Sequence, residues 1–532
     1  MSLKEEDRRT MVGLELEKSA HFMEQADMMR DHRENHCVNS RLDKVIPVKA
    51  CFVALIMLSA LMPVYAQTTF QQAYDAFRQG ARENYEDFRR KANREYAEWM
   101  RQAWEWHDKV EPMLSPKEEM LPPVIYQGKR EREESSPLPY DNVVTIPETK
   151  PQPKPVAPIR EQEGDFQTTT FHFFGTEGAV RLPKDFSFRL NGKDEKAYAA
   201  AWEVLSAGEY DNLIRDCLVL RMEHQLCDWA YLMMLGEMSE AVCGKGTNEA
   251  TMLQAFVFCQ SGYKIRLGFT KEGDLRLLFK SEHFIYDQSG FNMKDGRYYV
   301  LQDLEEGQGL NICDISYPEE QPLSLWIPQE QLLAEKMSEE RLLIPDDSLI
   351  AIRVQTNENW IKFCNSYPTS MMGENVMSRW AMYANTPMSK GVKEMLYPQL
   401  YETVRDADIL YAANWLLYWV QTAFVYEYDD KVWGDDRAFF AEETLYYPYC
   451  DCEDRAILYT RLVRDLLGLD CILVYYPGHL ASAVHFPIPV KGDYIDLQGK
   501  RFTICDPTYI GAPIGETMPD MDNQTAKVIL LE

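Results

Sequence analysis

The chain has 532 residues, of which 45% are hydrophobic and 26% are charged, a balance close to that of an average soluble globular protein. Its 56 Lys and Arg stand against 84 Asp and Glu, a net charge of −28, and a field of that sign disfavours nucleic-acid binding. No segment reaches the roughly 18 apolar residues of a membrane-spanning helix, which excludes a polytopic membrane protein. At about 150 residues per domain, the length predicts three or four domains.

An export signal lies near the N-terminus. Residues 50–62 read ACFVALIMLSALM, basic residues precede them, and small residues at Val64 and Ala66 offer a cleavage point before Gln67. This order is typical of a secretory signal, although a short buried helix or an uncleaved anchor gives a similar pattern. We assign residues 46–66 as a signal peptide. We therefore expect an extracytoplasmic protein, periplasmic or secreted, with no membrane span after cleavage.

Residues 1–45 precede the predicted signal peptide, although a signal peptide does not normally begin so far into a chain. Within them, GLELEKSAHFMEQADMM (residues 13–29) resembles the opening helix of a HEPN-type helical domain. The other helices of such a domain are missing, so nothing functional carries over. We interpret this stretch as an upstream extension or a misassigned start, with Met28 or Met29 as alternative starts.

The cysteine count does not indicate a disulfide framework. Two of the 12 cysteines, Cys37 and Cys51, precede the cleavage point, and the rest are spread over a long chain. An oxidising compartment would permit one or two bridges, but their pairing stays open.

Residues 67–110 are predicted to form an amphipathic helix. An 11-residue repeat places Tyr74, Phe77, Ala81, Tyr85, Phe88, Ala92, Tyr96, Trp99 and Ala103 at matching positions. Eleven residues fill about three turns, so these side chains form one nearly straight stripe. We expect the stripe to pack on a partner or on the main body.

Residues 111–163 are rich in proline and in charged runs such as REREESS, with little apolar periodicity. That composition predicts a semi-rigid linker that separates the helix from the body. The body then alternates between strand-like and helical patterns, and residues 309–395 are predicted to be β-rich, including the runs IAIRV and WIKF within residues 348–363.

Three segments near the C-terminus carry the residues of a thiol site. They are CDCEDRAILYTRLVRDLLGL (residues 450–469), GHLASAVHF (478–486) and TICDPTY (503–509). The first is predicted to be a helix that begins near Cys452, where free N–H groups favour a thiolate, although neighbouring acids oppose this. The others predict strands that place His479 and Asp506 within reach. A nucleophilic thiol needs such a base, and the base needs an acceptor that sets its tautomer.

These segments resemble the core of the transglutaminase-like superfamily, in which a helix-borne Cys is followed by Gly-His and then by Asp-Pro-Thr. The longer strings ETLYYPYCDCEDR and CDPTYIGAPIG resemble its secreted bacterial branch. The resemblance covers residues 396–532 and implies a papain-like α+β fold. It also implies that Cys452 is the nucleophile, His479 the general base and Asp506 the residue that orients the imidazole. The family's His-Ala-Trp reads His-Leu-Ala here, which leaves the substrate and acceptor open.

Several neighbouring residues compete for these roles. Cys450 is the other thiol, but Cys452 is nearer to the helical register. His485 is the other imidazole, and His479 is preferred because of its Gly-His context. Gln421 and Trp415 are the candidates for a second oxyanion donor.

The region of residues 164–308 is predicted to be a degenerate copy of this core. Ala250 matches Ala456 and Gly262 matches Gly468 at one offset, and Gly296 with Asp303 matches Gly499 with Asp506 at a nearby one. In this alignment Gly246 stands where Cys452 does and no His opens the following strand. The first copy would therefore be structural or substrate-binding.

The sequence thus predicts an exported bacterial α+β protein with a degenerate copy, a β-rich segment and a catalytic domain over residues 396–532. The predicted function is Cys-His-Asp acyl chemistry on peptide or carboxamide bonds, with peptide hydrolysis the simplest outcome. No cofactor and no metal is expected, because no His, Cys and carboxylate cluster has ligand spacing along the chain. The partners would be a peptide or protein substrate and a protein that docks on residues 67–110. A non-catalytic scaffold that retains the fold, or an amine acyltransferase, are the alternatives.

Overall fold

The computed structural model describes residues 87–532, apart from 118–119, 129–134, 149, 208, 303, 306, 347–349, 374 and 435. The upstream extension, the signal peptide, the first part of the predicted helix and Asp303 lie outside the described residues. The chain separates into two compact units, residues 1–81 and 82–532, and all elements below belong to the second. They mix helices with sheets, which confirms the predicted α+β class.

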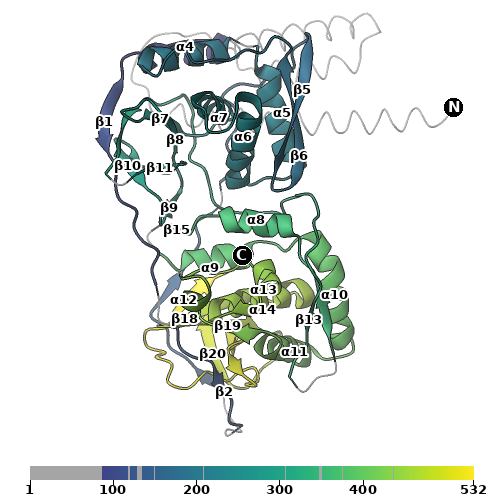
Figure 1. Cartoon of the computed structure of the whole chain (residues 1–532). Coiled ribbons are helices and arrows are strands. Elements are labelled where there is room, and N and C mark those ends of the chain that lie inside the picture. Colours follow the sequence, from purple (N-terminus) through teal and green to yellow (C-terminus); the bar gives the residue numbers. More distant parts are fainter. Residues whose placement is uncertain are drawn as a thin grey trace, which may run out of the picture. The chain divides into compact units, whose positions relative to one another are not determined.

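The N-terminal sheet has six strands (Figure 1). In spatial order they are β1 (Trp104–Asp108), β12 (Gly309–Cys313), β7 (Ile265–Phe269), β8 (Leu275–Phe279), β11 (Gly296–Val300) and β10 (Gly290–Met293). Around it lie α4 (Glu195–Ser206), α5 (Asp211–Glu223), α6 (Asp228–Cys243), α7 (Asn248–Gln260) and the hairpin of β5 (Phe166–Phe173) with β6 (Thr176–Pro183). Helix α7 is buried along almost all of its length, so its apolar residues form the centre of this part of the core.

The C-terminal sheet has seven strands. In spatial order they are β3 (Ser136–Pro137), β20 (Asp493–Leu497), β21 (Lys500–Cys505), β19 (His479–His485), β18 (Cys471–Tyr476), β23 (Lys527–Leu530) and β4 (Asn142–Val144). The helices here are α9 (Ser378–Asn385), α10 (Lys390–Val404), α11 (Ile409–Thr422), α12 (Asp429–Val432), α13 (Ala441–Tyr446) and α14 (Cys452–Leu467). Helix α14 packs on β18 and β19 and contacts α9, α11 and α13. This packing brings the start of the helix to the sheet.

The two sheets share one strand order. In the N-terminal sheet, α7 leads into the hairpin β7–β8, and β8 pairs with β11. In the C-terminal sheet, α14 leads into the hairpin β18–β19, and β19 pairs with β21. The last strand of each set (β12 or β23) pairs with the first hairpin strand. The predicted repeat stays a prediction, and this shared order is the observation that supports it.

Smaller pairs of strands complete the fold. They are β2 (Val124–Ile125) with β22 (Tyr509–Ile510), β9 (His283–Ile285) with β15 (Ser370–Met372), β13 (Arg341–Leu343) with β14 (Ile352–Val354), and β16 (Val425–Tyr426) with β17 (Tyr449–Cys450). Residues 309–395 also contain helices: WIKF lies in α8 (Glu358–Ser366) and not in a strand. The side chain of Asn357 accepts from the N–H of Asn359, and such a cap favours a helix at this point.

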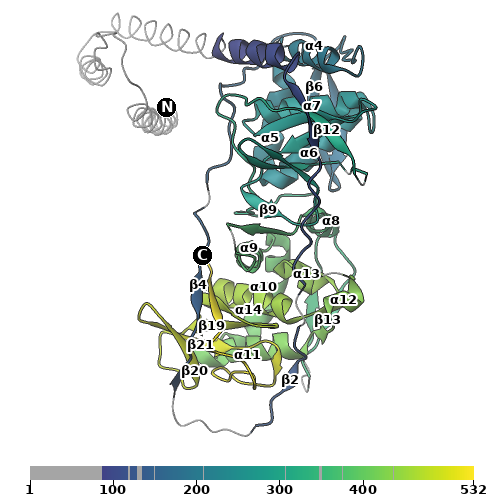
Figure 2. The ribbon, with the colours of Figure 1, turned by 90° about the vertical axis from the view of Figure 1, so that its left-hand side faces the viewer.

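The structure corrects the spacer predicted over residues 111–163, because three short strands within it, β2, β3 and β4, pair with strands of the body. Strands β3 and β4 form the two edges of the C-terminal sheet, and β4 lies beside β23 (Figure 2). Proline lacks an N–H and is tolerated in edge strands such as β3, which contains Pro137. These strands are too short to show the periodicity that identifies longer ones.

The predicted amphipathic helix is described over residues 87–100 and is followed by β1. It packs on the body through Ala92, Tyr96 and Met100, and the Tyr96 ring lies 4.8 Å from that of Trp202. The stripe differs in part from the prediction, because Phe88 and Trp99 are exposed. Among the residues that the structure describes, no helix has the length and apolar character that crossing a bilayer requires.

Candidate functional site

Cys452 is the first residue of α14 and is completely buried. The helix begins there because the carboxylate of Asp454 accepts from the backbone N–H of Asp451 at 3.2 Å, an arrangement that satisfies a free donor at a helix start. It ends at Gly468, whose φ of 64° is readily adopted by glycine. The competing thiol, Cys450, lies on β17 with its Sγ 3.8 Å from the carbonyl of Val425.

His479 and Asp506 are brought together at one end of the C-terminal sheet. His479 opens β19 and Asp506 directly follows β21, and Nε2 of the imidazole lies 2.8 Å from Oδ2 of the carboxylate. The other carboxylate oxygen accepts the N–H groups of Thr508 and Tyr509 at 2.9 and 3.1 Å. Asp506 is thus held from both sides, with its Oδ2 directed at the imidazole.

His485 lies at the opposite end of β19. Its Nδ1 donates to the carbonyl of Arg501 at 2.9 Å, and its ring packs beside Phe502. The structure therefore joins Asp506 to His479 and leaves His485 in a backbone contact.

The thiol lies beside the start of β19. The backbone N–H of Leu480, the residue after His479, favours the thiolate and so lowers the pKa of the Cys452 thiol. Nδ1 of His479 is buried and has no hydrogen-bond partner within the described structure. When Nε2 donates its proton to Asp506, Nδ1 carries the free lone pair, which is the tautomer that a general base requires.

Acidic neighbours surround the thiol. Burial first, and then the carboxylates of Glu453 and Asp451, raise the pKa of the Cys452 thiol well above its ordinary value, while the Leu480 N–H acts in the opposite direction. Cys452 Sγ lies 3.3 Å from Oε2 of Glu453, where the S–H can donate to the carboxylate. In this conformation the resting group is a protonated thiol.

A buried carboxylate cluster extends from the same place. It consists of Asp429, Asp436, Asp451, Glu453 and Asp454. Arg379 pairs with Asp436 at 2.7 Å, and burial raises the pKa of Asp429 to about 8. The ligand atoms of Asp429, Asp451 and Asp454 lie within 4.8 Å of one another, so this all-oxygen group could hold a hard cation. Spacing along the chain does not reveal this cluster, because Asp429 in α12 and Asp436 in the following loop are far in sequence from Asp451.

The proposed oxyanion donors do not fill that role in the described structure. Gln421 is buried on α11, and its Nε2 lies 2.8–3.1 Å from the carbonyls of Asp506, Tyr509 and Ala512, while its Oε1 accepts the N–H of Gly511. This amide fixes the loop that carries Asp506 and is not free for a substrate. Trp415 is half-buried against the hydrophobic core.

Two residues at the site were not found from the sequence. Met120, in the predicted linker, places its Sδ 3.6 Å from Sγ of Cys452. The neighbouring Leu121 donates its N–H to the carbonyl of Gly478 at 2.8 Å, and its own carbonyl accepts from the hydroxyl of Tyr426 at 3.3 Å. These residues are far from Cys452, His479 and Asp506 along the chain, so spacing does not connect them. The one signal in the sequence is the apolar run MLPPVIY within the charged linker.

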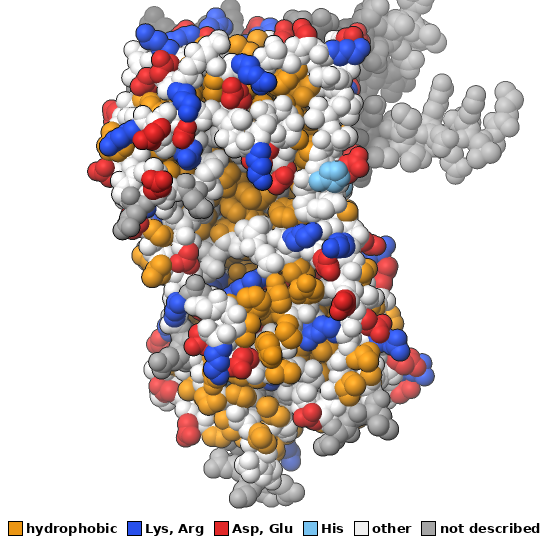
Figure 3. Space-filling model, in the orientation of Figure 1, with side chains coloured by type: hydrophobic (Ala, Val, Ile, Leu, Met, Phe, Trp, Pro, Cys, Tyr) orange, Lys and Arg blue, Asp and Glu red, His pale blue; other side chains and the backbone are white. Residues whose placement is uncertain are grey.

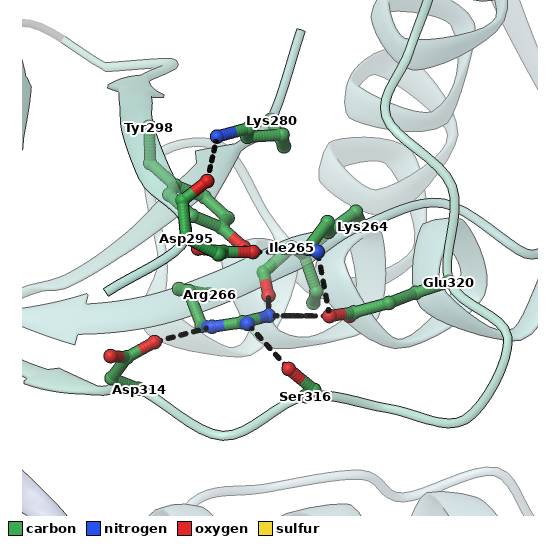
Figure 4. Close-up of polar contacts among 9 residues, drawn as sticks. All are labelled: Lys264, Ile265, Arg266, Lys280, Asp295, Tyr298, Asp314, Ser316 and Glu320. Carbon is green, nitrogen blue, oxygen red and sulfur yellow. Dashed lines mark hydrogen bonds and ion pairs between the residues drawn. The ribbon is translucent and has the colours of Figure 1, made fainter. Parts of the chain in front are cut away.

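The N-terminal sheet carries a different polar cluster, centred on buried Arg266 of β7 (Figure 4). Its guanidinium donates to Asp314 and Glu320 at 3.0 Å and to Ser316 at 2.9 Å, and lies over the ring of Tyr298. These groups satisfy one another, as expected of a structural network. No nucleophile stands at the start of α7, which follows Thr247.

In comparisons with known proteins, no family model, no curated protein and no solved structure matches this chain. The resemblance to the transglutaminase-like superfamily therefore stays a prediction from the residues quoted above. What the site can do chemically follows from its own geometry: a buried thiol, an imidazole with a free Nδ1 and a carboxylate that fixes the imidazole.

Proposed function

We propose that this protein is an exported, transglutaminase-like thiol enzyme that acts on peptide or carboxamide bonds, most simply by peptide hydrolysis. Cys452 is the nucleophile, His479 the general base and Asp506 the residue that orients the imidazole. The observation that supports this most strongly is the 2.8 Å contact between His479 Nε2 and Asp506 Oδ2, which leaves Nδ1 as the ring nitrogen without a partner in the described structure. The backbone N–H of the next residue, Leu480, lowers the pKa of the Cys452 thiol. Export rests on the signal pattern of residues 46–66.

The proposed reaction begins when the thiol proton passes to Nδ1 of His479 and Sγ attacks the carbonyl carbon. The amine leaves with a proton from the imidazolium, which gives a thioester and a free amine. Water then gives a proton to Nδ1 and attacks the thioester, and its collapse releases the carboxylic acid and restores the thiol. Asp506 stabilises the imidazolium in both halves.

A non-catalytic scaffold is the alternative that one observation favours. Burial and two adjacent carboxylates raise the pKa of the Cys452 thiol, which opposes formation of the nucleophile. The two functions differ in one measurable respect: an enzyme uses His479 to take the thiol proton, and a scaffold has no such coupling.

The test is the pH dependence of Cys452 alkylation by iodoacetamide, followed by mass spectrometry of the Cys452 peptide. His479→Ala should move the rise in rate to higher pH and slow the reaction at pH 7 about 100-fold, because the raised thiol pKa is then uncompensated. Asp506→Asn should shift the profile less, since the imidazole remains but its tautomer is wrong.

His485→Ala is the matched control, because it removes an imidazole from the other end of the same strand. Its profile should equal that of the parent protein. A profile that His479→Ala leaves unchanged would contradict the enzymatic proposal and favour the scaffold. A shift produced by His485→Ala alone would transfer the role of the base to that residue.

A further inference from the structure

Residues 120–126, which we term the strap, cross the thiol site. Met120 Sδ lies 3.6 Å from Cys452 Sγ. Farther along, Val124 and Ile125 form β2 and pair in parallel with β22, the strand that follows Asp506. The strap therefore runs from the nucleophile to the strand that follows Asp506, and together with the protein around it leaves Cys452 with no exposed surface.

The strap is held in the way that a peptide ligand is held. The Leu121 N–H donates to the carbonyl of Gly478, and the Leu121 carbonyl accepts from the Tyr426 hydroxyl. Both contacts use backbone groups that any residue would present. The pairing with β22 is likewise made by backbone, which is how an extended peptide adds to a strand. Pro122 and Pro123 favour an extended conformation between these contacts.

The surroundings of the strap are apolar and open to solvent. Val425 and Tyr449, on the strand pair that leads to Tyr426 and Cys450, are 58% and 41% exposed, and Leu121 on the strap is 37% exposed. Figure 3 shows that hydrophobic side chains also gather on the visible face of this part of the protein, near α10 and α11. Exposed apolar groups that lie together indicate a surface that contacts another chain.

We propose that the strap occupies the substrate cleft as an intramolecular substrate mimic. The protein as described is thus self-inhibited, and its substrate is an extended polypeptide with an apolar residue that takes the place of Met120 at the thiol. This inference rests on the proposed function, because it takes the cleft beside Cys452 to be catalytic. Tyr426 then contacts the substrate backbone through its hydroxyl, and Gly478 through its carbonyl.

The strap is suited to displacement. Leu121, Pro122 and Ile125 are exposed, and the strand pair with β22 comprises only two residues on each side. Its backbone contacts are ones that a substrate peptide can replace one for one. A competing peptide therefore needs no rearrangement of the sheet to enter.

The first test measures access to the thiol and needs no substrate. Met120→Ala should raise the rate of Cys452 alkylation by iodoacetamide at least about tenfold, because it removes the side chain that covers Sγ. Tyr426→Phe, which deletes one hydroxyl and keeps the ring, should raise it by a smaller factor. Met113→Ala is the matched control, since Met113 is an exposed methionine of the same segment, and should change nothing.

The second test adds the strap in trans. A synthetic peptide MLPPVIY should slow alkylation of the Met120→Ala variant in a saturable way, while a scrambled peptide of the same composition should not. Unchanged labelling in both Met120→Ala and Tyr426→Phe, with the melting temperature preserved, would overturn the proposal, as would equal protection by the two peptides. If Met120→Ala fails to fold, Tyr426→Phe carries the test.

The two proposals fail in different ways. If Met120→Ala or Tyr426→Phe raises the alkylation rate but His479→Ala leaves the pH profile unchanged, the strap proposal stands and the enzymatic proposal is refuted. If His479→Ala shifts the pH profile but neither Met120→Ala nor Tyr426→Phe raises the alkylation rate, the enzymatic proposal stands and the strap proposal is refuted.

Discussion

The loop that carries Asp506 depends on one side chain, Gln421. Its Nε2 reaches three backbone carbonyls and its Oε1 accepts one N–H, all within residues 506–512. A buried carbonyl without a donor costs free energy. Gln421 therefore holds the loop in which Asp506 lies. Because Asp506 contacts Nε2 of His479, Gln421 also acts indirectly on the tautomer of the imidazole. It is a positioning residue.

We predict that Gln421→Leu lowers the free energy of unfolding by roughly 2–4 kcal/mol, since it leaves several buried carbonyls without a donor. It should also move the alkylation profile of Cys452 in the direction of Asp506→Asn. Urea denaturation and the iodoacetamide assay measure these two effects. Leu416→Ala, on the same helix and completely buried, should cost about as much stability and leave the profile unchanged. A shift of the profile in Leu416→Ala as well would show that Gln421 acts only through stability.

At the residue scale, the sequence predicted the local positions of Cys452, His479 and Asp506, while their catalytic roles stay predictions. Cys452 follows a capped helix start, and His479 and Asp506 each stand at one end of a strand, so periodicity and spacing place them. Met120 contacts the thiol, Tyr426 contacts Leu121 beside it, and Asp429 joins the neighbouring carboxylate cluster, each from a segment whose local pattern does not indicate the site. These residues come to the site through tertiary contacts, which spacing along the sequence does not predict.

At the scale of elements, the Pro-rich segment is the main difference from expectation. Composition predicts a solvated spacer, but the segment pairs with three strands of the body, at β22, β20 and β23. It also packs closely elsewhere: a Cβ added at Gly262 would lie 2.1 Å from the carbonyl oxygen of Lys154. Such contacts are between backbones, so they leave no signature in side-chain composition.

The edge strand β4 offers a direct test. Val144 is buried and Asn142, two residues earlier on the same strand, is exposed. Val144→Asp should lower the free energy of unfolding by about 3 kcal/mol or more, because it buries a carboxylate without a partner. Asn142→Asp should cost less than about 0.5 kcal/mol. Urea denaturation of both variants is the measurement, and equal stabilities would mean that β4 contributes little to the sheet.

Helices and long strands were easier to predict than short ones. α14 carries a clear helical period and ends at Gly468, and Gly478 stands in the turn between the long strands β18 and β19; φ is positive at both glycines. WIKF, by contrast, reads as a strand because its residues are β-branched and aromatic. The Asn357 cap and burial of Trp360 and Phe363 against the core override that local preference.

At the scale of the whole molecule, residues 87–144 connect the two sheets by belonging to both. The helix over 87–100 and β1 extend the N-terminal sheet and its core, and β3 and β4 close the edges of the C-terminal sheet. The same segment supplies the strap between these contacts. Residues 111–144, which composition assigns to the linker, thus carry both strand pairing and the proposed inhibition.

This arrangement predicts how truncation acts. A protein that starts at Gly164 loses β1, β3 and β4, exposes the partners of Tyr96 and Val144, and should melt at least roughly 10 °C below the parent protein. A protein that starts at Arg82 keeps the complete second unit and should melt at the temperature of the parent. Differential scanning calorimetry compares the three. Loss of the segment removes edge strands from both sheets, so we expect the whole transition to move and not only one part of it. If the protein that starts at Gly164 melted like the one that starts at Arg82, residues 111–163 would act as the spacer that their composition suggests, and the strap would not be held on the thiol.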